Sequence, residues 1–461
     1  MITRRHLLLL SGFAGTQLVV QGIGFLCGLL LLRVMTVTQY GIYTLAVSLT
    51  GVVAMLADLG LTSAMLPQGA PCLTQPARLT QLLAQARTLS WRFGLVSLLL
   101  WPPVLVQLLR RQQVEPGQVV ALALLVGVTA WLQVQAGLAL TLVRLLGHTR
   151  WQQLFDLTAQ SIRLLVLLLI SAVGASAALG LGGWRLDATA ACAISLLLAA
   201  VSWLAVERHL RRHLGGSMRE PANAQSHAHD DHRAGLLHFV RRQGPNTVYY
   251  IVNGQIAVWL IGWFGHAERV AEVGALGRLG VLFTVLGSVS SALLLPYFAR
   301  RTAVADVAAG LQLVHGFFAL LLLTLAGAAA WLPQLFLWVL GPRYAGLQAE
   351  LIWMVVASTL ATWGGTVYSI GCSRGWVVPI MQSAPAGLGA IAFTAVLVDV
   401  STVRGSYLIH LSSAVAALLI SSAYLQRQLR SGHAAAPCAH EAATTLPAAS
   451  PHDRAPQPSH A

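Results

Sequence analysis

The chain alternates between long uncharged stretches and shorter segments that hold almost all of its charged residues. A helix needs about 20 apolar residues to cross the hydrocarbon core of a bilayer, so uncharged runs of that length are the expected spans. Twelve such runs are present, at 7–32, 40–66, 93–109, 119–143, 158–180, 188–206, 247–266, 279–299, 307–331, 351–370, 375–398 and 405–425. The pattern predicts an all-α integral membrane protein with about twelve transmembrane helices.

Composition supports this prediction. Hydrophobic residues make up 56% of the chain and charged residues 10%, whereas a soluble domain is about one quarter charged. The five cysteines are scattered without CxxC spacing, so neither a disulfide framework nor a cysteine zinc site is expected. We expect no cofactor and no metal.

The arginines indicate the orientation of the chain. All 29 basic residues are arginine, and the formal net charge is +14. With the N-terminus in the cytoplasm, the cytoplasmic segments hold 20 arginines, the opposite connections hold 8, and Arg163 falls within a span. Cytoplasmic loops of membrane proteins collect such charges, which also face anionic headgroups. We therefore expect a multi-pass protein of the bacterial inner membrane with both termini cytoplasmic, membrane lipids as partners, and no nucleic acid.

One long polar segment, 207–245, separates the first six spans from the last six. It contains seven arginines and six histidines, namely His209, His213, His227, His229, His232 and His238. A metal site is one interpretation of these histidines. A solvated cytoplasmic linker is favoured, because the segment offers no supporting second shell. The predicted organisation is a bundle at 1–206, this linker, a bundle at 246–425, and a disordered cytoplasmic tail at 426–461.

The two halves share one sequence feature. Gly41 follows span one and precedes Pro67 by 26 residues, and Gly274 follows span seven and precedes Pro296 by 22 residues. Both pairs run in the same direction relative to the membrane. This correspondence predicts two six-helix bundles related by a parallel internal repeat.

Four short motifs resemble those of the multidrug/oligosaccharidyl-lipid/polysaccharide (MOP) exporter superfamily, and specifically its bacterial polysaccharide-biosynthesis flippases. They are Leu32-Arg33-Val34-Met35 leading to Gln39-Tyr40-Gly41-Ile42-Tyr43, Asp58-Leu59-Gly60-Leu61, Glu272-Val273-Gly274 leading to Arg278, and Leu340-Gly341-Pro342-Arg343-Tyr344-Ala345-Gly346. The resemblance extends to about Tyr424.

That resemblance implies two bundles around a central cavity that opens alternately to each face. It implies as cargo a polyprenyl-pyrophosphate-linked oligosaccharide, for O-antigen, exopolysaccharide or capsule synthesis. Polysaccharide polymerase or assembly proteins are the implied protein partners, and no enzymatic activity is implied. A Walker-type phosphate loop is excluded by the absence of lysine, so an ion gradient or the membrane potential is the expected energy source.

Three arginines are candidates for holding an anionic headgroup. Arg278 opens the eighth predicted span and matches an arginine that serves substrate binding in peptidoglycan-lipid flippases, although Val281 stands where those relatives have an acid. Arg33 ends span one and either faces the cavity or marks the interface. Arg163 lies within span five, where it either faces a cavity or extends to the headgroups.

The other candidates are polar groups within spans. Asp58 lies near the far end of span two. There it either carries a coupling proton or pairs with an arginine, or else it caps the helix end or contacts interfacial water. Amides lie on the first span of each half and either line a sugar-binding cavity or join helices by hydrogen bonds: Gln17, Gln21, Asn246, Asn253 and Gln255.

Three alternative functions remain open. A multidrug or cation antiporter of the same superfamily is disfavoured because spans one and seven contain no acid. A membrane enzyme of polysaccharide assembly is disfavoured because the outward loops are short. A scaffold without transport activity is the third.

Overall fold

The computed structural model describes residues 4–69, 72–73, 75–177, 186–214, 226–301, 303–374 and 376–431. These residues form helices and connecting turns without any strand. Eleven helices are long and apolar enough to cross a membrane, or twelve if the two arms of one bent helix form a single span. The predicted all-α membrane architecture is therefore confirmed.

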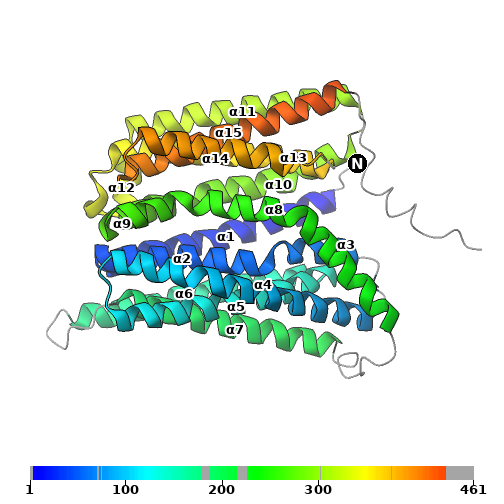
Figure 1. Ribbon diagram of the computed structural model, residues 1–461, viewed down its shortest axis with the longest axis horizontal. Helices are drawn as coiled ribbons and strands as arrows, with labels where there is room; N and C mark the ends of the chain where they lie inside the picture. The colour runs from blue at the N-terminus through cyan, green and yellow to red at the C-terminus, as the bar shows by residue number, and fades with distance from the viewer. Residues whose placement is uncertain are drawn as a thin grey trace, which may run out of the picture.

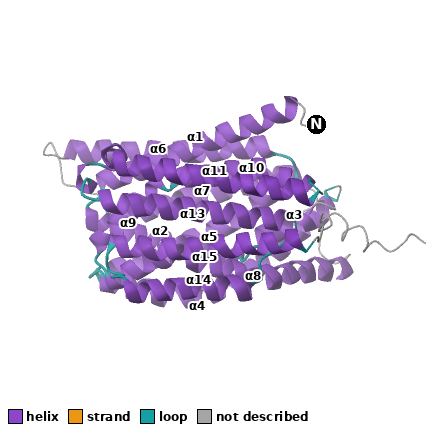
Figure 2. Cartoon of the chain, turned by 90° about the horizontal axis from the view of Figure 1, so that it is seen from above, coloured by secondary structure: helices purple, strands orange, loops and turns teal. Residues whose placement is uncertain are grey.

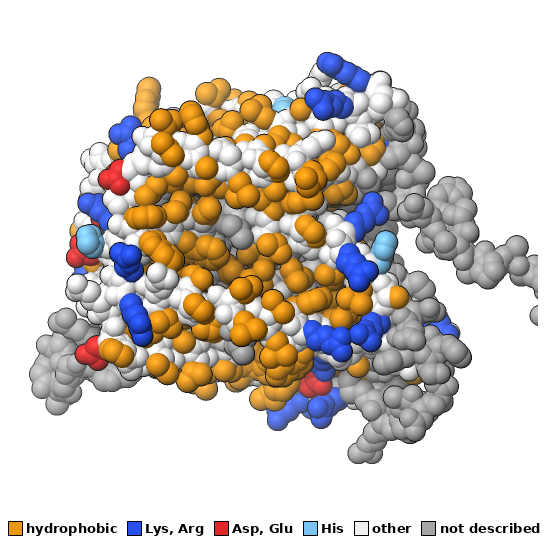
Figure 3. Space-filling model, viewed as in Figure 1, with side chains coloured by type: hydrophobic (Ala, Val, Ile, Leu, Met, Phe, Trp, Pro, Cys, Tyr) orange, Lys and Arg blue, Asp and Glu red, His pale blue; other side chains and the backbone are white. Residues whose placement is uncertain are grey.

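The outer surface suits a lipid environment. On the face shown in Figure 3, large apolar side chains cover the middle of the molecule, while charged side chains gather towards its two ends. Leu99 and Trp331, for example, are 78% and 89% exposed. Such a wide apolar belt is what a bilayer would cover.

The helices form two lobes (Figure 1). The N-terminal lobe contains α1 (Arg4–Val34), α2 (Val37–Asp58), α3 (Leu61–Gly69), α4 (Pro76–Arg111), α5 (Pro116–Leu145), α6 (Thr149–Ala177) and α7 (Ala188–Leu214). The C-terminal lobe contains α8 (Ser226–Phe264), α9 (Ala267–Leu279), α10 (Val281–Arg300), α11 (Val304–Trp331), α12 (Pro333–Leu340), a 3₁₀ turn η3 (Pro342–Tyr344), α13 (Gln348–Ser373), α14 (Ile380–Leu397) and α15 (Val403–Arg430).

The long helices run nearly parallel, so the molecule has two ends (Figure 2). We call the end at which α2 and α9 begin the α12 end, and the opposite one the α3 end (Figure 1). Under the orientation expected from the arginines, the α3 end is cytoplasmic.

The second span of each lobe is broken. The first break lies between α2 and α3, where Leu59 and Gly60 adopt φ values of 41° and 85°. Asp58 stabilises this turn, since its carboxylate accepts hydrogen bonds from the Gly60 and Thr62 backbone N–H groups and from the Thr62 hydroxyl. The second break lies at Gly280, between α9 and α10.

Two predicted boundaries need correction. The eighth span was expected from residue 279, but α9 begins at Ala267, so Arg278 lies inside the lobe interface. The third span was expected from residue 93, but α4 begins at Pro76 and bends by 41° ahead of Pro102. An uncharged run ends wherever it meets an arginine, whereas a helix continues through an arginine whose guanidinium finds hydrogen-bond partners or water.

The long polar segment also differs from a simple linker. The helix α7 continues to Leu214 and α8 begins at Ser226, so the described part of 207–245 is helical. The N-terminal part of α8 forms an arm that crosses to the other lobe, where Leu236 and Val240 join a buried cluster with α3, α4, α5 and α7. Pro245 lies inside α8 where this arm meets the C-terminal lobe. Residues 215–225 and the predicted tail from 432 onwards lie outside the described residues.

Buried apolar clusters show how the lobes are joined. At the α12 end, one continuous cluster draws on both lobes, including Leu31, Leu45, Leu276 and Tyr407. At the α3 end, the described buried residues form two separate clusters, one for each lobe. The arm of α8 is the part of the C-terminal lobe that enters the N-terminal cluster.

Candidate functional site

The lobes approach most closely where the repeated glycines lie. A side-chain carbon at Gly41 of α2 would overlap the Ala267 carbonyl oxygen of α9. A side-chain carbon at Gly274 of α9 would lie 2.5 Å from the Thr44 hydroxyl of α2. Each motif glycine therefore permits a contact with the other lobe that no larger residue would allow.

Arg278 lies directly behind this contact. Its Nε donates a 2.8 Å hydrogen bond to the Tyr40 hydroxyl, and its guanidinium lies 5.8 Å from the centre of the Tyr40 ring. Its side chain also packs against Gly28 of α1, where a side-chain carbon would be 2.8 Å away. The arginine is thus held between the lobes by neutral partners, and its charge is not neutralised by an ion pair in the described structure.

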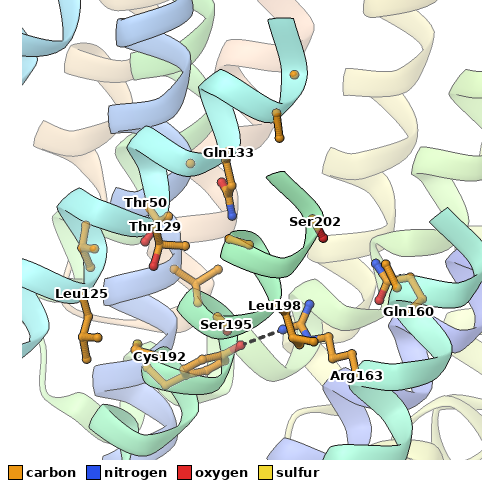
Figure 4. Close-up of a pocket in the computed structure, with 18 of the residues that line it drawn as sticks. Thr50, Leu125, Thr129, Gln133, Gln160, Arg163, Cys192, Ser195, Leu198 and Ser202 are labelled. Carbon is orange, nitrogen blue, oxygen red and sulfur yellow. Dashed lines mark hydrogen bonds between the residues drawn. The ribbon is translucent and has the colours of Figure 1, made fainter. Parts of the chain in front are cut away.

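Arg163 of α6 lies on the other side of the same tyrosine pair. Its Nη2 donates a 3.3 Å hydrogen bond to the Tyr43 hydroxyl (dashed line in Figure 4). The rings of Tyr40 and Tyr43 are 6.3 Å apart. The two arginines therefore flank one aromatic pair on α2.

Arg163 also lines a pocket of about 450 Å³ within the N-terminal lobe, bounded by α2, α5, α6 and α7. Its polar lining is otherwise uncharged and comprises Tyr43, Thr50, Thr129, Gln133, Gln160, Ser195 and Ser202 (Figure 4). Hydroxyl and amide groups of this kind suit hydroxyl-rich ligands.

A second pocket, of about 340 Å³, lies at the C-terminal lobe and reaches α2. Arg278 contributes its charge, and its other polar lining residues are Thr44, Ser48, Gln255, Ser358, Ser406, Tyr407 and His410. Among the described residues that line the two pockets, none is an aspartate or a glutamate. The charged side chains available to a ligand there are therefore arginines.

Two predicted site residues lie elsewhere. Arg33 is exposed at the α12 end, where its Nη2 donates to the Val339 carbonyl and it lines a separate pocket with Arg343 and Tyr344. Burial raises the pKa of Tyr344 to about 12, so this neighbour stays uncharged at neutral pH. The Asp58 carboxylate is used within its own turn, which matches the capping interpretation.

The predicted amides divide between the two interpretations. Gln255 lines the second pocket. Asn253 accepts a hydrogen bond from the Ser413 hydroxyl of α15, which joins two helices of the same lobe. Gln17 and Gln21 are half-buried on α1 and line neither pocket, and Asn246 is buried.

Several lining residues were missed from the sequence. Gln133 and Gln160 lie in different helices and meet only in the fold. Tyr40 and Tyr43 stand within a family motif and were not predicted as site residues, although two phenols three residues apart on one helix face are a visible signal.

Comparison with known proteins gives a likeness in structure. No protein-family model matches the chain, and no curated protein matches it in sequence. A mutant of the Vibrio cholerae MATE transporter VcmN superposes with a TM-score of 0.56 at 14% identity, covering 92% of this chain and 99% of that one. The outward-facing form of a multidrug resistance MATE family transporter of the MOP superfamily gives 0.58 at 13% identity, covering 92% and 96%.

A eukaryotic MATE transporter, AtDTX14, gives a TM-score of 0.53 at 11% identity over 93% of this chain and 98% of its own. At such identities the comparison establishes the fold. The chain has the two-lobed helical fold of MATE transporters of the MOP superfamily.

Proposed function

We propose that the protein is a flippase that moves polyprenyl-pyrophosphate-linked oligosaccharides across the inner membrane for surface polysaccharide synthesis. The observation that carries this proposal is the pair Arg163 and Arg278, which flank Tyr40 and Tyr43 in pockets lined without carboxylates. The fold supports a membrane transporter, and the charges of the pockets favour an anionic cargo.

The chemistry of such a cargo fits these pockets. A pyrophosphate must leave water to cross the bilayer, and two arginines compensate its charge through paired hydrogen bonds. The hydroxyl and amide groups of the N-terminal pocket supply uncharged partners for the sugar. The polyprenyl tail stays in lipid, so the protein needs to shelter the headgroup alone.

The state of the lobes is consistent with loading from the cytoplasm. Buried side chains join the lobes at the α12 end, whereas the described residues form separate clusters at the α3 end. If the α3 end is cytoplasmic, this is the state that accepts cargo from the inner leaflet. Rocking of the lobes would then separate them at the α12 end and bring them together at the α3 end.

A multidrug antiporter is the second candidate, because the structural neighbours include multidrug resistance MATE transporters. An organic cation needs a carboxylate or an aromatic cage in the bundle. The arginines in both pockets oppose such a cation, so the flippase is favoured.

The test is transport by the purified chain in proteoliposomes. The probe is a short polyprenyl-pyrophosphoryl disaccharide with a fluorescent sugar, and its transfer is followed by a quencher confined to the outside. We expect Arg278→Ala and Arg163→Ala each to lower the initial rate at least about tenfold, the usual cost of losing a charged hydrogen-bonding partner. Arg278→Lys keeps the charge but loses the planar fork, and is expected to recover only part of the rate.

Arg269→Ala is the matched control, because Arg269 lies on the same helix and is exposed in an ion pair with Glu272. It should transport at the original rate. Equal rates for Arg278→Ala, Arg163→Ala and this control would contradict the proposal. Transport of ethidium but not of the glycolipid would establish the antiporter instead.

A further inference from the structure

Three histidines converge at the α3 end of the N-terminal lobe, away from both pockets. His148 lies in the turn between α5 and α6, whereas His209 and His213 lie four residues apart on α7 and so share one helix face. Their ring centres are 4.5 to 5.3 Å apart. One nitrogen from each ring can be chosen so that all three lie within 4.8 Å of one another.

The spacing of these nitrogens matches a metal-binding arrangement. His148 Nδ1 and His209 Nε2 are 3.3 Å apart. Two nitrogens held about 2.0–2.1 Å from a tetrahedral ion are separated by about 3.3 Å, so these two nitrogens are already at the separation that such a site requires. A nitrogen of His213 lies within 4.8 Å of the other two, and its exposed side chain is free to change rotamer towards an ion.

The neighbouring side chains support the arrangement. Trp151 stacks on the His209 ring at 3.8 Å between centres, and Phe155 stacks on Trp151. These contacts fix the plane of His209. The nearest acid on α7, Glu207, is engaged by Arg87 at 2.7 Å and by Arg211 at 3.5 Å, so it is committed to an ion pair.

We propose that His148, His209 and His213 bind a divalent transition-metal ion of the zinc class. Three neutral imidazoles suit Zn²⁺, Co²⁺ and Ni²⁺, and the exposed side of His213 leaves the fourth position to water. The ion would tie the turn between α5 and α6 to the end of α7. Ser202 of the N-terminal pocket lies seven residues before His209 on α7, about 10 Å along the helix. The metal would therefore stabilise the helices that line that pocket.

This inference does not depend on the cargo and departs from the expectation of no metal site. The sequence placed His209 and His213 in a polar segment with other histidines, and only the fold brings His148 to them.

The test uses the purified full chain with a tag that contains no histidine, after removal of metal by a chelator. Co²⁺ is titrated alone, and the visible absorption of four-coordinate Co²⁺ is recorded, followed by displacement with Zn²⁺. We expect about one Co²⁺ per chain in a four-coordinate site. Each of His148→Ala, His209→Ala and His213→Ala should weaken binding at least about tenfold, since even outer-shell changes cost that much.

Two controls identify the ligands. A variant with His227→Ala, His229→Ala and His232→Ala removes the three closely spaced histidines at the start of α8, and His238→Ala removes an exposed histidine on the same helix. Both should bind Co²⁺ as the original chain does. His213 is exposed, so its variant is expected to elute from size exclusion unchanged and to keep the measurement interpretable.

Co²⁺ binding that survives His213→Ala and His209→Ala together would overturn the site. Loss of binding in the control variant with His227→Ala, His229→Ala and His232→Ala would also overturn it. A six-coordinate spectrum or the absence of any Co²⁺ binding would overturn it as well.

Discussion

The two ends of the lobe interface are built differently. At the α12 end, Gly41 of α2 packs against the Ala267 backbone of α9 and Gly274 of α9 packs against the Thr44 side chain of α2, closer than larger residues would permit. At the α3 end, the arm of α8 lies on the other lobe through side chains such as Leu236 and Val240. The first contact requires exact geometry, whereas the second requires apolar area.

This difference indicates how the lobes can separate. A backbone contact is lost in one step when the helices part, while an apolar arm can slide or tilt and remain buried. We therefore expect substitutions at the α12 end to change the state of the protein, and substitutions at the α3 end mainly to change its stability.

The largest effect is expected for Gly41→Leu. Forcing even single methylenes into a packed core costs about 1–3 kcal/mol, so a whole leucine side chain is expected to prevent closure at the α12 end. Cys27 lies in the shared cluster and is 1% exposed, which makes it a reporter of closure. In a variant whose other cysteines are serine, a water-soluble maleimide should label Cys27 fully after this substitution.

Gly22→Leu on α1 is the control, because a side-chain carbon there meets nothing within 4 Å. It should leave Cys27 protected. Protection of Cys27 in the Gly41→Leu variant would show that closure does not depend on this glycine.

The next largest effect is expected at the arm. Leu236 is fully buried, so Leu236→Ala should lower the free energy of unfolding by about 2–5 kcal/mol. The arm should also detach more often, and trypsin should cleave faster at the exposed Arg241 and Arg242. His238→Ala, on the exposed face of the same arm, should change neither the melting temperature nor the cleavage rate.

A smaller effect is expected for Gln112→Ala. Gln112 caps the C-terminus of α4, and its side-chain amide donates to the Gly262 carbonyl of α8 at 2.8 Å and to the Gly265 carbonyl just after α8 at 3.2 Å. Loss of these hydrogen bonds across the α12 end should cost about 1 kcal/mol and raise Cys27 labelling slightly. Labelling as fast as in Gly41→Leu would mean that hydrogen bonds, and not close packing, hold this end.

The smallest effect is expected for Arg33→Ala. Arg33 reaches the Val339 carbonyl through a 3.4 Å hydrogen bond at an exposed position. A change within about 0.5 kcal/mol is expected in thermal unfolding, with unaltered Cys27 labelling. A loss as large as that of Leu236→Ala would mark Arg33 as a principal contact between the lobes.

Much of this fold could be predicted because lipid imposes a simple rule on the sequence. Every span had to be an apolar run of about 20 residues, and such runs are visible without knowledge of their neighbours. The prediction was wrong where a charge lies inside a helix. Arg278 bounded a run in the sequence, yet the helix that carries it begins at Ala267, and the Tyr40 hydroxyl from the other lobe accepts the Arg278 hydrogen bond.

The candidate site was predicted in part for the same reason. A charge within a span is rare enough to be noticed alone, so Arg163 was found. Its partners were not, because Gln133, Gln160 and Ser202 are ordinary polar residues until three helices bring them together. Asp58 shows the reverse case, since its hydrogen bonds lie within four residues and capping was one of its two interpretations.

The arm of α8 has a further consequence for how far the two lobes can separate at the α3 end. Within the described residues, the arm and the first span of the C-terminal lobe form one continuous helix that contains Pro245. While the arm stays packed on the N-terminal lobe, the first span of the C-terminal lobe can move only as far as bending at Pro245 allows. The separation of the lobes at the α3 end would then depend on the angle of α8 at Pro245 rather than on the side chains that line either pocket.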